Sequence, residues 1–205
     1  MIQGHEGFAQ AAQMTAGRPV QEDGSELRAA PRIALMLRVG KLCLPNGEFL
    51  CVVRDASESG LKVKLFHDLE PHTACELELG TGDRYALEFV WAADGHAGYR
   101  FTAGAIDVQA LIDEATPFPR RQLRLRLDRP IALSIGNEMH PAQLRDISQH
   151  GVLVDFHERL PLGCAIRLEA PGFPVLDGRV RWRLSRAHGI VLQRSFRLDE
   201  LAALA

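Results

Sequence analysis

Short stretches of alternating apolar and polar residues run along most of the chain. This alternation is the period of a β-strand that buries one face. The clearest examples are 61–65, 75–79, 152–156 and 180–184. Turn signals such as Pro45-Asn46-Gly47 separate the stretches. Near residues 106–112 and 198–204 the apolar spacing changes to that of a short helix. The pattern therefore predicts an all-β fold with short C-terminal helices.

One sequence motif occurs twice. The pattern R-D-x-S-x-x-G stands at 54–60 and again at 145–151, so the two copies are 91 positions apart. The same offset carries Trp91 onto Trp182, near the end of each copy. Landmarks that keep one spacing over such a distance indicate an internal duplication.

The duplication divides the chain into two small domains. We expect an N-terminal tail at 1–25 that is flexible, a first domain at 26–114, a linker at 115–119 and a second domain at 120–205. Each copy contains about six short strands separated by turns. Strands at this spacing are typical of a small closed barrel or a sandwich.

Composition indicates in which compartment of the cell we expect the protein. The chain is 46% hydrophobic and 24% charged. No apolar run approaches the roughly 20 residues that span a bilayer. Because the first 25 residues lack a basic start followed by an apolar stretch, we expect no secretory signal. The four cysteines form no C-x-x-C pair, which favours reduced thiols in a cytoplasmic protein.

Charge is distributed unevenly along the chain. Residues 1–115 carry 10 Lys and Arg against 17 Asp and Glu, a net of -7, whereas residues 116–205 carry 14 against 9, a net of +5. An anionic ligand would therefore meet a more favourable field in the second half. The chain has 21 arginines but three lysines, and arginine suits the bidentate recognition of phosphate.

The duplicated motif can be explained locally as a turn. Its Asp can accept backbone N–H bonds, and its Gly permits positive φ or close approach. A second element points beyond a turn, because arginines four positions apart precede the first strand of each copy. They are Arg28 with Arg32, and Arg120 with Arg124. Guanidinium groups can form paired bonds with phosphate or with the N7 and O6 edge of guanine.

The order R-x-x-x-R, then D-x-S-x-x-G, then a strand pair with a Trp and a short helix, resembles the PilZ domain. The resemblance covers about 26–114 and 118–205 and is closer in the second copy. It implies two tandem six-stranded antiparallel β-barrels that bind the bacterial second messenger cyclic di-GMP. The ligand-binding residues that it implies are Arg120, Arg121, Arg124, Asp146, Ser148 and Gly151 in the second copy, and Arg28, Arg32, Asp55, Ser57 and Gly60 in the first.

The resemblance also implies a role for each residue of the motifs. The arginines would clamp phosphate and the Hoogsteen edge of guanine. Asp146 would accept a hydrogen bond from a guanine N–H, Ser148 would bond the ligand, and Gly151 would permit its close approach. In the first copy, residues 29–31 are Ala-Ala-Pro where 121–123 are Arg-Gln-Leu, and the turn contains Glu58. These differences favour tighter binding by the second copy.

Other patterns in the sequence give weaker indications of a metal site, a ligand site or a catalytic site. His67, His72 and Cys75 fit no common zinc template and lack a fourth ligand, so loop histidines and a buried cysteine explain them better. Trp91 and Trp182 stand at inward positions of the alternation, so we expect both in cores. Nothing in the sequence resembles an activated nucleophile or a metal site. We therefore expect neither enzymatic activity nor a cofactor.

The leading hypothesis is a receptor or adaptor for cyclic di-GMP. Binding would order the arginine loop, change the geometry between the domains and so signal to a downstream protein. The alternative is a PilZ-like adaptor that binds a protein but no nucleotide. A nucleic-acid-binding barrel is disfavoured, because aromatic residues make up 6% of the chain and offer no outward stacking series. We expect no membrane contact, and homo-oligomerisation stays open.

Overall fold

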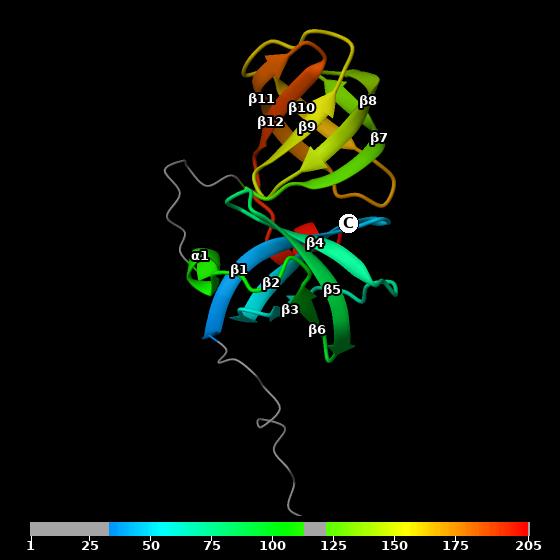
Figure 1. Cartoon of the computed structure of the whole chain (residues 1–205). Helices are drawn as coiled ribbons and strands as arrows, with labels where there is room; N and C mark the ends of the chain where they lie inside the picture. The colour runs from blue at the N-terminus through cyan, green and yellow to red at the C-terminus, as the bar shows by residue number, and fades with distance from the viewer. Residues whose placement is uncertain (1–32, 113–121, 205) are drawn as a thin grey trace, which may run out of the picture.

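The protein folds into two β-barrels, one above the other in Figure 1. The computed structural model describes residues 33–112 and 122–204. The first barrel contains β1 (Ile33–Leu44), β2 (Gly47–Ser57), β3 (Gly60–Leu65), β4 (Ala74–Leu79), β5 (Arg84–Ala93) and β6 (His96–Phe101), followed by α1 (Val108–Ile112). The second contains β7 (Leu125–Ile135), β8 (Glu138–Ile147), β9 (Gly151–Asp155), β10 (Ala165–Glu169), β11 (Leu176–Leu184) and β12 (Ala187–Leu192), followed by α2 (Leu198–Ala202).

Both barrels are closed, antiparallel and identical in strand order. The order is β1-β2-β3-β6-β5-β4 in the first barrel and β7-β8-β9-β12-β11-β10 in the second. Strands β2, β3, β4 and β6 begin 91 positions before their counterparts β8, β9, β10 and β12. The predicted all-β fold of two six-stranded antiparallel barrels is therefore confirmed. The predicted tail at 1–25 and the predicted linker at 115–119 lie wholly outside the described residues, so the domain boundaries stay a prediction.

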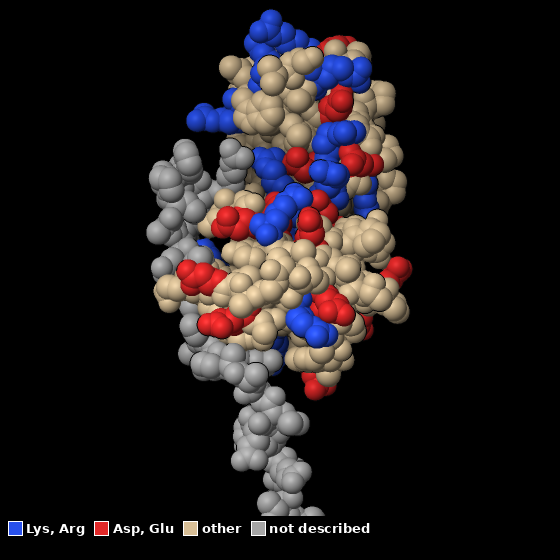
Figure 2. All heavy atoms as spheres, in the orientation of Figure 1, with Lys and Arg blue, Asp and Glu red and all other residues tan. Residues whose placement is uncertain are grey.

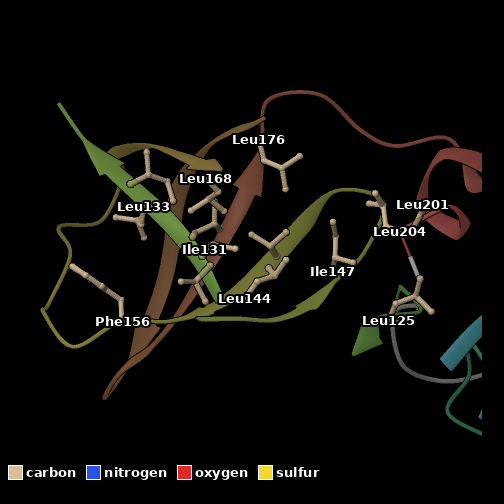
Figure 3. Packing of buried hydrophobic residues seen from close by; sticks show 14 of the residues in the cluster. Leu125, Ile131, Leu133, Leu144, Ile147, Phe156, Leu168, Leu176, Leu201 and Leu204 are labelled. Carbon is tan, nitrogen blue, oxygen red and sulfur yellow. The ribbon is translucent and has the colours of Figure 1, made fainter. Parts of the chain in front are cut away.

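Each barrel buries an apolar core because alternate residues of its strands point inward. In β3, Leu61, Val63 and Leu65 are buried while Lys64 is exposed, as the alternation predicts. The second core is drawn in Figure 3, where side chains from β7, β8, β10 and β11 converge and Phe156 lies at one end. Fully burying a leucine or phenylalanine stabilises the fold by about 1.5–3 kcal/mol.

A short helix follows the last strand of each barrel, as predicted. In α1, the Asp107 carboxylate accepts the backbone N–H of Gln109 at 2.9 Å. In α2, the Glu200 carboxylate accepts the backbone N–H of Arg197 at 2.9 Å, one half of a capping box. Leu201 of α2 is buried in the second core. Within the described ranges, no helix is long and apolar enough to cross a membrane.

Both tryptophans lie on the outside of the barrels, so the prediction that they are core residues was wrong. Trp91 is 37% exposed and Trp182 is 43% exposed. A β-bulge explains the difference. The register of β11 and β12 shifts between Val180 and Trp182, so the extra residue Arg181 reverses the alternation. The matching strands of the first barrel contain the same shift.

The outer face of β1 and β2 contacts the second barrel. Leu50 of β2 is 1% exposed and packs in the core cluster of the second barrel. Its cross-strand neighbour in β1 is Lys41, whose side chain is 6% exposed. We call Lys41, Glu48 and Leu50 the docking face. Because these strands are covered outside as well as inside, β1 reads as a nearly continuous apolar run.

Candidate ligand-binding site

The turn between β8 and β9 carries the second copy of the duplicated motif. Ser148 is 1% exposed, and its hydroxyl donates to the Gly151 carbonyl at 3.0 Å. The backbone N–H of Gly151 donates to Oγ of Ser148 at 3.2 Å. Ser148 therefore closes the turn, and one lone pair of its hydroxyl is left for any further bond.

The glycine of the motif is required by the neighbouring strand. A Cβ at Gly151 would lie 2.8 Å from the carbonyl oxygen of Ile190 in β12. The first barrel repeats this arrangement, with a Cβ at Gly60 lying 2.3 Å from the carbonyl oxygen of Tyr99 and the Ser57 hydroxyl donating to the Gly60 carbonyl at 3.2 Å. Strand pairing thus explains the serine and glycine in both barrels. Their role toward a ligand stays a prediction.

Arg124 and Asp146 form an ion pair beside the second turn. Nη1 of Arg124 donates to Oδ1 of Asp146 at 2.6 Å, and the two side chains are 43% and 22% exposed. The sheet register explains their meeting. Asp146 is the cross-strand partner of Arg126, so Arg124 is its diagonal neighbour two residues earlier. The structure thus joins the arginine motif and the turn motif of the second barrel.

A surface pocket of about 150 Å³ lies beside this ion pair. Its walls come from the β8–β9 turn and from the outer faces of β11 and β12. Arg124, Ser148 and Gly151 line the pocket together with Arg181 and Trp182. Two guanidinium groups and one flat aromatic ring therefore border the same hollow. Such a set suits a ligand that carries both phosphate and a planar base.

The position of Trp182 depends on a glycine in the next strand. A Cβ at Gly189 would lie 2.1 Å from Nε1 of Trp182, so the indole ring occupies the space over that glycine. Trp91 covers Gly98 in the same way in the first barrel. In the sequence, the tryptophan and the glycine stand at the same spacing in both copies. The sequence does not show the β-bulge, and the bulge decides that the tryptophan side chain points outward.

Two further lining residues were not predicted. Nε2 of Gln122 and Nδ1 of His150 share a hydrogen bond of 2.7 Å, and both residues line the pocket. Each lies at a variable position inside one of the two motifs, Gln122 within R-x-x-x-R and His150 within D-x-S-x-x-G. Their proximity follows from the position of the β8–β9 turn beside the start of β7.

The candidate residues are only partly covered by the structure. Arg28, Arg32, Arg120 and Arg121 lie outside the described residues. In the first barrel, Asp55 and Ser57 lie at the end of β2 and Gly60 begins β3, with Asp55 the cross-strand partner of Lys62. Glu58 is exposed at the tip of that turn.

Metal-ligating side chains do not cluster in the described part of the chain, and two of the cysteines are buried. There, no group of three His, Cys, Asp or Glu side chains could hold a metal ion. His72, once a conceivable zinc ligand, shares a hydrogen bond of 3.0 Å with the Tyr99 hydroxyl. Burial raises the pKa of Cys75 to about 12, and burial also raises the pKa of Cys51. Both thiols are therefore protonated and unsuited to nucleophilic chemistry.

Comparison with known proteins gives a family match to the second barrel. Residues 118–203 match the family model of the PilZ domain. No curated protein matches the chain.

Several solved structures give weak matches that extend over most of the chain. PlzA of Borreliella burgdorferi in complex with c-di-GMP is 11% identical, covers 88% of this chain and 95% of its own, and has a TM-score of 0.34. The motility inhibitor MotI/DgrA of Bacillus subtilis is 13% identical, with coverage of 82% and 94% and a TM-score of 0.33. YcgR of Escherichia coli in complex with c-di-GMP is 12% identical, with coverage of 78% and 76% and a TM-score of 0.28. At these scores the matches say nothing about individual site residues.

Proposed function

We propose that the second barrel, which is a PilZ domain, binds cyclic di-GMP at the pocket beside Arg124. The observation that carries this proposal is the meeting of Arg124, Asp146 and Trp182 at one place on the barrel. A guanidinium donates to phosphate or to the N7 and O6 of guanine, and a carboxylate accepts from guanine N–H groups. An exposed indole offers a flat surface to the base.

Ligand binding would replace contacts that cost little to lose. The Arg124–Asp146 pair is partly exposed, and such pairs contribute about 0–1 kcal/mol. Both groups are therefore available to a guanine nucleotide. The pocket of about 150 Å³ is smaller than the roughly 300–1,000 Å³ that encloses a drug-sized ligand. In the proposed complex Arg120 and Arg121 cover the remainder of the nucleotide.

The proposal gives the arginine segment a signalling role. In the sequence, residues 120–124 follow the predicted linker at 115–119 directly, and the carbonyl of Arg124 accepts a hydrogen bond from Lys41 of the docking face. Fixing this segment on a ligand would alter the contact between the barrels, and a downstream protein could recognise the altered arrangement. Small-angle scattering with and without cyclic di-GMP tests this step. An unchanged scattering envelope would count against it.

Calorimetric titration with cyclic di-GMP tests the binding site. Arg124→Ala is expected to weaken binding about tenfold or more, since a hydrogen bond from a charged group contributes about 1.5–3 kcal/mol. Arg145→Ala is the matched control. Arg145 precedes Asp146 directly but pairs with Asp128 at 3.1 Å and lies outside the lining of the pocket. It should bind as the wild type does.

Two outcomes would contradict the proposed site. The first is equal loss of affinity in Arg124→Ala and Arg145→Ala. It would mean that binding depends on the overall positive charge and not on a specific contact of Arg124. The second is a wild type that does not bind cyclic di-GMP, which would favour the protein-binding adaptor. We further propose that the first barrel binds more weakly, because Glu58 places an anion beside its turn. Equal losses from Arg32→Ala and Arg124→Ala, in a titration that resolves both sites, would contradict that asymmetry.

A further inference from the structure

The start of β7 has a strand partner on one edge only. Strand β8 pairs with β7 from Leu125 onward, whereas β10 pairs only with 132–134 on the other edge. On that second edge, the carbonyl of Arg124 and the N–H of Arg126 have no partner among the described strands of the second barrel. The docking face of the first barrel supplies their partners. Figure 2 shows charged side chains gathered along this boundary between the barrels.

The buried ammonium group of Lys41 holds the carbonyl of Arg124. Nζ of Lys41 lies 3.0 Å from that oxygen, 3.0 Å from Oε2 of Glu48 and 3.5 Å from Oε2 of Glu78. One hydrogen bond and two ion pairs surround the ammonium group, as a charged side chain with 6% exposure requires. The two carboxylates of the first barrel pair with the ammonium group, and its hydrogen bond reaches the second barrel.

Glu48 holds the backbone on the other side of Leu125. Its Oε2 accepts the N–H of Arg126 at 2.8 Å while it also pairs with Lys41. Leu125, between the two bonded residues, has 0% exposure and packs in the second core. We call the two bonds, from Lys41 to the Arg124 carbonyl and from the Arg126 N–H to Glu48, the bracket.

We propose that Lys41 and Glu48 of the first barrel are positioning residues for the nucleotide site of the second barrel, an inference that rests on the proposed function of that site. The bracket fixes the backbone from Arg124 to Arg126, and from this backbone the Arg124 guanidinium reaches Asp146 at 2.6 Å. Neither positioning residue lines the pocket beside Trp182. They act on the ligand through Arg124.

The bracket couples the two barrels in both directions. A ligand that holds the Arg124 guanidinium also holds the carbonyl that Lys41 binds. Because coupling between two binding events is reciprocal, loss of the bracket weakens the binding of the ligand, and loss of the ligand weakens the contact between the barrels. The first barrel is in this way a structural part of the nucleotide site even though it donates no group to the pocket.

A double-mutant cycle in the full-length chain tests the inference. Lys41→Met removes the ammonium group and keeps an unbranched side chain. We expect affinity for cyclic di-GMP to fall roughly tenfold, the worth of one hydrogen bond from a charged group. In an Arg124→Ala background the same substitution should have no further effect, because no guanidinium remains to be positioned. Lys41→Arg, which keeps the donors, should restore most of the affinity.

Arg84→Met is the matched control. Nη2 of Arg84 pairs with Oε2 of Glu78 at 2.7 Å, so its removal takes one positive charge from the same carboxylate that Lys41 contacts. The described contacts of Arg84 stay within the first barrel. It should bind cyclic di-GMP as the wild type does. Equal losses in Arg84→Met and Lys41→Met, or an undiminished Lys41→Met effect without the Arg124 guanidinium, would overturn the inference.

Hydrogen exchange separates this inference from the proposed function. Without ligand, Lys41→Met and Glu48→Met should each speed exchange of the Arg126 amide roughly tenfold, because that amide loses its fixed acceptor. A wild type that does not bind cyclic di-GMP would refute the function, and the exchange rates would still decide whether the bracket holds the segment. Unchanged protection of the Arg126 amide in both variants would overturn the bracket.

Discussion

Arg124 and Asp146 stand 22 positions apart in the sequence, and the guanidinium of the first donates to the carboxylate of the second at 2.6 Å. The pair lies next to a bulge in β7, where the register shifts between Arg126 and Arg129. The two groups therefore bond to each other. A ligand that separates them must offer an acceptor to Arg124 and a donor to Asp146, and a guanine edge offers both.

Replacing Asp146 by Asn tests whether its carboxylate recognises guanine. A carboxylate can accept two neighbouring N–H groups, whereas an amide presents only one acceptor there. We expect Asp146→Asn to weaken cyclic di-GMP binding roughly tenfold, although it removes a negative charge near an anionic ligand. Cyclic di-AMP, whose adenine lacks O6, should bind poorly to both proteins. Calorimetry measures both; tighter binding by Asp146→Asn would contradict the assigned role.

The glycines beneath the two tryptophans provide a matched pair of variants. A Cβ at Gly189 or at Gly98 would lie 2.1 Å from Nε1 of the tryptophan above it. Each Gly→Ala change should destabilise the protein by about 1–3 kcal/mol or displace the ring. Only Gly189→Ala should also weaken cyclic di-GMP at the second site, because Trp182 lines that pocket. Urea denaturation, tryptophan fluorescence and calorimetry separate these effects; similar affinity losses in both variants would argue against a role for Trp182.

Truncating Leu50 should destabilise the second barrel although the residue belongs to the first. Leu50 packs in the second core cluster, so Leu50→Ala leaves a cavity there and should cost about 2–5 kcal/mol. Leu42→Ala, in the core of the first barrel, is the control. Hydrogen exchange resolved by strand measures where protection is lost. Loss confined to β1–β6 in both variants would refute the assignment of Leu50.

The buried thiol of Cys75 should make the protein less stable at alkaline pH. Burial raises the pKa of this thiol from 9.0 to about 12. Between these values the unfolded chain releases the proton while the folded chain keeps it, so the free energy of unfolding decreases as pH rises from about 9 towards 12. Cys75→Ala should reduce this slope, with Cys51 retaining part of it. Urea denaturation across this range measures the slope. The same slope in the wild type and in Cys75→Ala would contradict the prediction.

The strands were predictable because each one buries a single face. Leu61, Val63 and Leu65 alternate in the sequence and are buried in the structure. The direction of Trp182 was not predictable, because one extra residue in β11 reverses every side chain beyond it. A two-residue period contains no record of where a bulge occurs. The same limit applies to Trp91 in the first barrel.

The candidate site was predictable as two motifs but not as a surface. The order of Arg124 and Asp146 in the sequence indicated a shared site, and the structure places them in contact. The contribution of Gln122 and His150 depends on which loops become neighbours after the barrel closes. Lys41 stands in the sequence inside a mostly apolar stretch at 33–44, and the sequence does not tell which outer face a second domain will cover.

The docking face has no counterpart on the second barrel. The residues that stand 91 positions after its three members are Ala132, Met139 and Pro141. A head-to-tail contact between repeated units grows into an open filament when every unit presents both complementary surfaces. Here the second barrel lacks the ammonium, the carboxylate and the leucine that would receive another barrel. The sequence of the second barrel therefore does not repeat this contact for a further barrel.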